Sequence, residues 1–175
     1  FVDIVRDRDL MNNQNMLIQM KDIVDVNMSE MNKIAAQIST DPELTPYFIS
    51  KNFYNALLAR RTMNYTIANE FIEHLTYYIR DEQYLYSAQS TYTISRFIDD
   101  IYKYKEWTID EFSKDINTIT RPILRPAEDV AMSQSFIERY ITYLVPVPVN
   151  HPQPYGTVIF QIKENTLREM LLAIM

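Results

Sequence analysis

Residues 136–172 read FIERYITYLVPVPVNHPQPYGTVIFQIKENTLREMLL, and this stretch decides the fold. The apolar, β-branched and aromatic run Tyr140–Val147 predicts a strand, and Thr157–Ile162 predicts a second strand. Between them, residues 146–154 hold four prolines, which cannot continue a hydrogen-bonded ladder. Helical spacing then follows in Leu167, Met170, Leu171 and Ile174. We therefore expect two adjacent antiparallel strands that lead into an exit helix.

Gly156 is the only glycine in the chain, and it immediately precedes the second of these strands. Glycine is the residue with the fewest backbone restrictions. We expect Gly156 at a turn or at the tight start of a strand, where a side chain would fit poorly. A positive φ there would be the backbone reason for the glycine.

The composition limits the function classes that the chain can serve. With 175 residues, 47% of them hydrophobic, it can bury the core of one domain. Its net charge is −6 and no basic block stands out, so we expect no nucleic-acid contact. The absence of cysteine excludes disulfides, thiolate catalysis and cysteine-bound metals, and we expect no cofactor. Because the sequence starts at Phe1 without a signal peptide or membrane-length apolar run, we expect an excised fragment.

Residues 1–40 predict one long helix. They contain neither proline nor glycine, and apolar residues recur seven apart at Leu10, Leu17, Val24, Met31 and Ile38. One interpretation is a helix packed along its own domain. The other is a stalk that forms a homodimer, because heptad spacing favours a partner helix. Residues 41–175 then form the domain proper.

The middle of the chain alternates helices and strands. Asp41 followed by proline predicts a new helix start, and a second helix is expected from Phe53 to near Asn69 or Glu70. Residues 72–79 and 84–88 predict the two strands of a β-hairpin around a polar turn.

Two short helices should follow the hairpin. The first is indicated by apolar spacing over residues 94–102, and the second by Thr108 as an N-cap before Ile109–Ile116. Residues 121–126 are limited by two prolines to an edge strand or a loop. Neighbouring strand pairs with helices between them indicate an α+β fold with one antiparallel sheet.

Four features resemble a known family. They are the long N-terminal helix, the hairpin LTYYIRDEQYLYS at residues 75–87, the lone Trp107, and the strands ITYLVPVP at 141–148 and YGTVIF at 155–160. Together they resemble the extracytoplasmic Cache (PAS-like) sensor region of bacterial membrane receptors. The likeness is to the membrane-distal half of the double-Cache region in membrane-bound AraC-type transcription regulators of Gram-positive bacteria.

The resemblance implies a fold, a location and a role. The fold would be a long N-terminal helix packed on a PAS-like antiparallel sheet with flanking helices. The domain would lie outside the cell membrane, anchored by segments beyond this fragment, and would bind a small-molecule ligand without acting as an enzyme. The signal would pass to a cytoplasmic DNA-binding output.

One departure from the family bears on the ligand. The amino-acid-binding members carry an Arg-x-Trp-Tyr run, whereas this chain has Lys105-Glu106-Trp107-Thr108. Lysine lacks the bidentate fork that suits a carboxylate. We therefore expect a ligand other than an α-amino acid held by a carboxylate clamp.

Aromatic residues supply the candidate ligand site. Tyrosine combines a flat apolar ring with a polar tip, which suits pockets for small polar ligands. We expect the site in a cleft over the sheet, roofed by residues 92–116. The candidate aromatic residues are Tyr78, Tyr86, Trp107 and Tyr143, with Arg121 and Arg125 as anion partners.

Two other interpretations stay open. The chain could be a protein–protein interaction or oligomerisation domain, with the long helix as its assembly element. Acidic pairs such as Asp99-Asp100 could serve hydrolysis, although solvated surface charge explains them more simply. His74 and His151 lie far apart in the sequence, and we expect surface or satisfied histidines. Membrane segments on both sides of the fragment would support the sensor.

Overall fold

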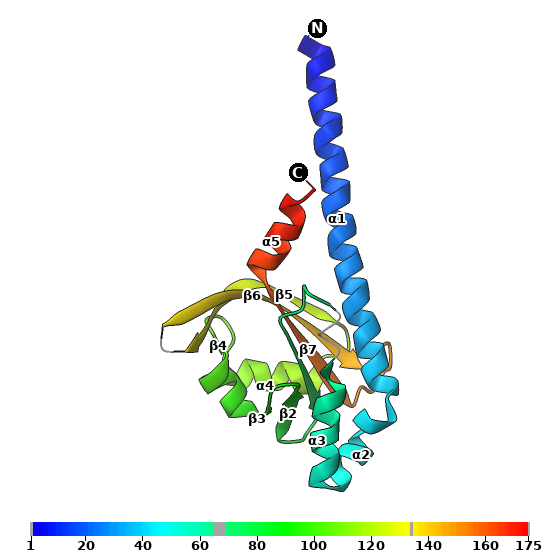
Figure 1. The fold of residues 1–175 in the computed structure, drawn as a ribbon, viewed down its shortest axis with the longest axis vertical. Coiled ribbons are helices and arrows are strands. Elements are labelled where there is room, and N and C mark those ends of the chain that lie inside the picture. Colours follow the sequence, from blue (N-terminus) through cyan, green and yellow to red (C-terminus); the bar gives the residue numbers. More distant parts are fainter. Residues whose placement is uncertain (1, 65–68, 134, 175) are drawn as a thin grey trace.

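The protein is built around one curled antiparallel sheet with helices on both faces (Figure 1). In this computed structural model, which describes residues 2–64, 69–133 and 135–174, the sheet has seven strands in the order β3-β2-β1-β7-β6-β5-β4. The strands are β1 His74–Ile79, β2 Tyr84–Ser87, β3 Thr91–Thr93, β4 Lys103–Tyr104, β5 Ile123–Ser133, β6 Phe136–Val147 and β7 Gly156–Lys163.

The central pairing joins segments that are far apart in the sequence. β1 pairs antiparallel with β7, with Tyr77 opposite Val158, while β2 continues the hairpin on the other side of β1. The predicted hairpin and the two predicted C-terminal strands therefore share one sheet. The predicted α+β class, with a long N-terminal helix on an antiparallel sheet, is confirmed.

The helices are α1 Val2–Thr40, η1 Pro42–Leu44, α2 Pro46–Lys51, α3 Phe53–Thr62, the π-helical turn η3 Arg96–Ile101, α4 Ile109–Thr118 and α5 Glu164–Leu172. Four of the described helices, η1, α2, α3 and α4, begin at a residue whose side chain caps the first turn. The Asp41 side chain accepts a hydrogen bond from the Glu43 backbone, and Thr108 does the same for Glu111. These bonds satisfy backbone donors that the first helical turn leaves unpaired.

Each face of the sheet carries its own hydrophobic core. On one face, the second half of α1 buries Met31, Ile34 and Ile38 against strand residues that include Tyr77 and Phe160. On the other face, the segment from η3 through β4 to α4 buries Phe97, Trp107, Phe112 and Ile116. We call this segment the roof. It spans residues 96–118 and overlaps most of the segment 92–116 that the sequence analysis expected over the sheet.

The structure corrects two boundaries. The second predicted helix ends at Thr62, and residues 69–70 are not helical, while residues 65–68 lie outside the described residues. The segment 121–126, expected as an edge strand or a loop, is a loop at residues 121–122 and then the start of β5, which pairs with β6 here and with β4 only at Val130 and Ala131. The extent of β5 to Ser133 was not predicted. Pro126 is tolerated there because the register with β6 shifts between Arg125 and Glu128.

Gly156 is required by packing and not by its dihedral angle. It is the first residue of β7, and its φ is not positive, so the conditional backbone explanation was wrong. A Cβ at this position would lie 2.9 Å from Tyr77 Cε1, 3.0 Å from the Tyr78 carbonyl oxygen and 3.1 Å from Val147 Cγ2. The backbone of β7 can approach β1 and β6 only without a side chain.

Both ends of the chain leave the sheet in the same direction (Figure 1). The first half of α1 extends beyond the domain, and α5 turns back beside α1 directly after β7. The Asn27 amide nitrogen lies 3.8 Å from Met170 Sδ and links the two helices. None of the helices within the described residues has the length and apolar character to cross a membrane.

Candidate ligand-binding site

A row of polar side chains crosses the sheet beneath the roof. Arg125 on β5 lies opposite Thr142 on β6, and Thr142 lies opposite Gln161 on β7. Gln161 in turn lies opposite His74 on β1. Residues directly opposite in an antiparallel pair share a face, and Leu144, two residues from Thr142, packs in the core under the roof. Thr142 and Gln161 are both fully buried.

Tyr104 of β4 reaches down from the roof into the centre of this row. Its hydroxyl lies 2.7 Å from Thr142 Oγ1 and accepts a hydrogen bond from Gln161 Nε2 at 2.8 Å. Burial raises the pKa of Tyr104 to about 12, and the bonds from Thr142 and Gln161 oppose that rise. The residue is therefore a neutral phenol at physiological pH.

Several polar atoms of the row have no hydrogen-bond partner within the described residues. They are Gln161 Oε1, Glu128 Oε1, Arg125 Nε and His74 Nδ1. A buried polar atom without a partner costs about 1–3 kcal/mol, so each of these atoms calls for a partner such as a buried water molecule or a polar group of a ligand. Gln161 Oε1 and Glu128 Oε1 are both hydrogen-bond acceptors, so a complementary group would have to supply N–H or O–H donors.

Trp107 anchors the roof over Arg125. The indole nitrogen donates to Asp115 Oδ2 at 2.9 Å, and the Arg125 guanidinium lies 4.3 Å from the ring centroid. Arg125 also donates to Glu128 Oε2 at 2.9 Å, in an ion pair whose side chains are 18% and 8% exposed. The cation is thus already neutralised by Glu128 and stacked on Trp107.

His74 closes the row at its other end. Its ring centroid lies 5.2 Å from that of Tyr102 in the roof and 6.0 Å from that of Tyr140 on the sheet. Burial lowers the pKa of His74, and Lys163 adds to that effect while Glu73 opposes it. The sequence suggested a surface or satisfied histidine, but this one is partly buried and its Nδ1 lacks a partner within the described residues.

The predicted site residues are only partly brought together. Trp107 and Arg125 are in direct contact, as described above. Tyr78 lies on the same face, but its hydroxyl is engaged with the Glu82 carbonyl oxygen at 3.1 Å and with Asn117 Oδ1 at 3.0 Å. Arg121 is exposed and precedes β5. A ligand role for these residues stays a prediction.

The remaining two tyrosines belong to the opposite face of the sheet. Tyr143 and Tyr86 are buried in the core under α1, and the Tyr143 hydroxyl donates to Asn32 Oδ1 of α1 at 2.8 Å. The predicted set is therefore divided between the two faces. A ligand bound on one face of the sheet cannot also contact side chains on the other face, so these two tyrosines do not belong to the polar row.

The residues chosen from the sequence did not include Tyr104, Thr142, Gln161, His74 or Glu128, although His74 was considered as a residue near the pocket and Glu128 as part of an acidic pair. A signal for two of them was present, because Thr142 and Gln161 interrupt strands that are otherwise almost wholly apolar. A polar residue at an inward position of a buried strand requires a partner. The sequence around Tyr104 gave no such signal, because it does not show that the sheet curls enough to bring Tyr104 to Gln161.

Comparison with known proteins shows the fold. No protein-family model matches the chain, and no curated protein matches it. Several solved structures do match the chain. The sensory domain of the Campylobacter jejuni chemoreceptor Tlp3 with isoleucine bound is similar with a TM-score of 0.59 and 13% identity, over 94% of this chain and 63% of that one.

Two further solved structures agree with this. A domain of a sensory box/GGDEF family protein from Vibrio parahaemolyticus has a TM-score of 0.57 and 9% identity, covering 90% of this chain and 61% of that one. The extracellular domain of the histidine kinase vpHK1S-Z8 has a TM-score of 0.57 and 10% identity, covering 90% and 58%. This chain has the fold of sensory domains. It spans about three fifths of the length of the domains that it matches.

Proposed function

We propose that this chain is the ligand-sensing module of a membrane-anchored bacterial receptor and lies outside the membrane. The observation that carries the proposal is the polar row under the roof, where buried acceptors lack partners within the described residues. The fold supports it, because one similar structure is a chemoreceptor sensory domain with isoleucine bound. No group of three or more metal-ligating side chains gathers in the described part of the chain, so the argument rests on hydrogen bonding.

The ligand that suits the row is a small molecule with N–H or O–H donors. Gln161 Oε1 and Glu128 Oε1 would accept from it, and Trp107 and Tyr104 would supply aromatic contact. The free α-carboxylate of an amino acid is a poorer match. Arg125 is committed to Glu128, and Lys105, at the position of the family's arginine, is exposed. This agrees with the expectation, drawn from the sequence of residues 105–108, that the ligand is not an α-amino acid held by a carboxylate clamp.

A short route leads from the row to the exit helix. Gln161 is three residues before Glu164, where α5 begins, and β7 continues into α5 without a loop. Arg139 of β6 holds the start of α5 through Glu164 at 2.9 Å. A ligand that binds two arrangements of Gln161 with different affinities would therefore bias the position of α5 beside α1.

The output and the assembly follow the family resemblance. We propose that α5 leads toward a cytoplasmic transcription-regulating output of the AraC type, and that the receptor works as a homodimer through the first half of α1. Both chain ends point the same way, which suits anchoring on one side (Figure 1).

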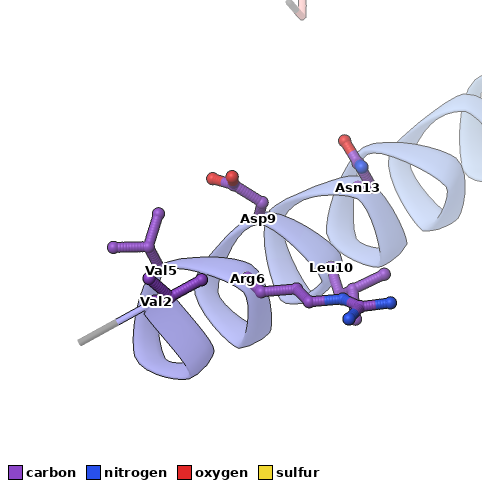
Figure 2. Close-up of a pocket in the computed structure, with 6 residues that line it drawn as sticks. All are labelled: Val2, Val5, Arg6, Asp9, Leu10 and Asn13. Atoms are coloured by element: carbon purple, nitrogen blue, oxygen red, sulfur yellow. The ribbon is translucent and has the colours of Figure 1, made fainter.

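The second candidate, an oligomerisation domain, is favoured by that uncovered half of α1. A shallow hollow of about 410 Å³ runs along its first turns and is lined by Val2, Val5, Arg6, Asp9, Leu10 and Asn13. Figure 2 shows that these side chains all come from α1. One helix alone supplies all of these residues, so the hollow suits a second helix better than a small molecule. Leu10 is 53% exposed and Leu17 is 64% exposed.

Amide NMR spectra of the ¹⁵N-labelled chain would test the sensor proposal. A panel of small amines, amides and polyols is added one member at a time. Binding to the row predicts shifts at Tyr104, Gln161 and His74 that continue into α5. Shifts confined to α1, or no shifts with any member, would favour the oligomerisation domain instead.

A further inference from the structure

We infer that a second site, for a small organic anion with a flat apolar body, lies in the groove between α3 and the β2–β3 edge of the sheet. The groove has a volume of about 520 Å³, within the range of small-molecule sites. Its lining includes Phe53, Leu57, Arg60, Tyr84, Tyr86 and Thr91. It opens on the face opposite the polar row, so this inference does not depend on the proposed sensing site.

Arg60 supplies the cation of this site in a fixed position. Its Nη2 donates to the Gln89 carbonyl oxygen at 2.6 Å and its Nε to that of Ser87 at 3.4 Å. No hydrogen bond or ion pair to Nη1 occurs within the described residues, and no carboxylate there neutralises the group. Two backbone carbonyls thus orient the guanidinium, so an anion would not have to order a free side chain.

Tyr86 lines the same groove as Arg60 and offers a second donor, its phenol hydroxyl. Burial raises the pKa of this hydroxyl, and nearby Glu82 adds to that effect, so the phenol stays protonated. Its hydroxyl has no hydrogen-bond partner within the part of the chain that the structure describes. An Arg nitrogen together with a phenol hydroxyl can bind the oxygens of one carboxylate, sulfonate or phosphate.

The walls supply apolar contact for the rest of the ligand. Phe53 of α3 is 80% exposed, and Tyr84 of β2 is 45% exposed. Both residues line the groove, Phe53 from α3 and Tyr84 from β2. Their flat faces suit a ring or another planar group.

The local charge favours an anion over other ligands. Residues 44–63, which form α2 and α3 with their flanks, contain Lys51, Arg60 and Arg61 and neither Asp nor Glu. This cationic segment stands in a chain with a net charge of −6. Figure 1 shows α2 and α3 at the end of the molecule farthest from both termini, where a ligand can approach freely.

Fluorescence titration with two matched dyes tests the inference. The probes are anilinonaphthalene sulfonate, an aromatic anion, and N-phenylnaphthylamine, its uncharged counterpart. We expect saturable binding of the anion to one site, about tenfold tighter than the neutral dye, since an ionic hydrogen bond is worth at least a factor of ten. Arg60→Gln should remove that difference, and Tyr86→Phe should weaken the anion severalfold.

Arg61→Gln is the matched control, because Arg61 is an exposed neighbour on α3 outside the groove and should leave binding unchanged. Phe53→Ala should weaken both dyes and, because Phe53 is so exposed, should leave the thermal melt unchanged. If Arg60→Gln fails to fold, Phe53→Ala and Tyr86→Phe decide the matter. Equal binding of the two dyes, binding unaffected by these variants, or binding lost in Gln161→Leu would overturn the inference.

Discussion

The hydroxyl of Tyr104 accepts a hydrogen bond of 2.8 Å from Gln161 Nε2, although their strands are not neighbours. β4 lies at the edge of the sheet, and β5 and β6 separate it from β7. The contact therefore requires the sheet to curl, and it ties the roof directly to the floor of the polar row. The roof therefore cannot open at Tyr104 without breaking this hydrogen bond and exposing Gln161.

Alkaline pH should weaken the fold through Tyr104. Burial raises its folded-state pKa to about 12, whereas an unfolded tyrosine ionises near 10. The folded state holds this proton more tightly, so its stabilising contribution is complete below about pH 10 and is lost as the pH rises toward 12. Urea unfolding at a series of pH values should show this loss, and Tyr104→Phe should reduce its slope. An identical slope in Tyr84→Phe, whose tyrosine is half-exposed, and in Tyr104→Phe would contradict the assignment.

Mild acid should weaken the fold through His74. Burial lowers its folded-state pKa below the ordinary value of 6.5. The stabilising contribution of the neutral ring is therefore present above about pH 6.5 and is lost as the pH falls through the lower folded-state pKa. Between pH 7 and pH 4, the melting temperature of His74→Leu should fall less than that of the wild type. His151→Gln is the control and should behave as the wild type does. A histidine Cε1 proton of residue 74 that titrates at or above 6.5 by NMR would show the account to be wrong.

Gly156→Ala should destabilise the protein although its backbone is ordinary. The new methyl group would meet Tyr77, the Tyr78 backbone and Val147 at 2.9–3.1 Å, and all three belong to buried strands that cannot shift freely. Overpacking of this kind costs about 1–3 kcal/mol. Urea denaturation measures the loss, with Gln153→Ala in the exposed connection before β7 as the control. An unchanged midpoint for Gly156→Ala would mean that β7 can shift.

The first half of α1 should pair with a second copy. Leu10 and Leu17 lie seven residues apart on its uncovered surface, as coiled-coil pairing requires. Sedimentation velocity should show a concentration-dependent dimer, and Leu10→Glu with Leu17→Glu should leave a monomer. Asn12→Glu with Gln19→Glu, which adds the same charge at two exposed positions on the opposite side of the helix, should not. A wild type that stays monomeric at all concentrations would contradict this pairing and would mean that α1 makes contacts only within its own chain.

The sequence predicted the architecture because long elements carry strong periodic signals. The helix over residues 1–40, the hairpin at β1 and β2, and the strands β6 and β7 were all predicted. β3 and β4 were missed because three and two residues are too short to show alternation. The extent of β5 was missed because Pro126 argued against a strand, and only the structure shows the register shift that accommodates it.

The candidate site was harder to predict than the fold, and Tyr143 shows why. A one-residue change of position along a strand moves a side chain to the opposite face. β6 is buried on both faces over residues 142–147, so its pattern does not tell which face carries the site. Tyr143 was chosen for its aromatic ring, whereas its neighbour Thr142 lies in the polar row.

Ligand-induced thermal shift in the wild type and in Gln161→Leu tests the central claim most directly. Leucine fills the same buried position. It removes an acceptor without a partner and also the Nε2 donor to Tyr104, whose hydroxyl keeps its contact with Thr142, so the variant should still fold. A bound ligand stabilises the folded state by about 2.7 kcal/mol at a hundredfold excess over Kd. The account predicts that at least one small amine, amide or polyol raises the melting temperature of the wild type and has no effect on Gln161→Leu. Equal shifts in both proteins, or no shift of the wild type by any member of the panel, would contradict it.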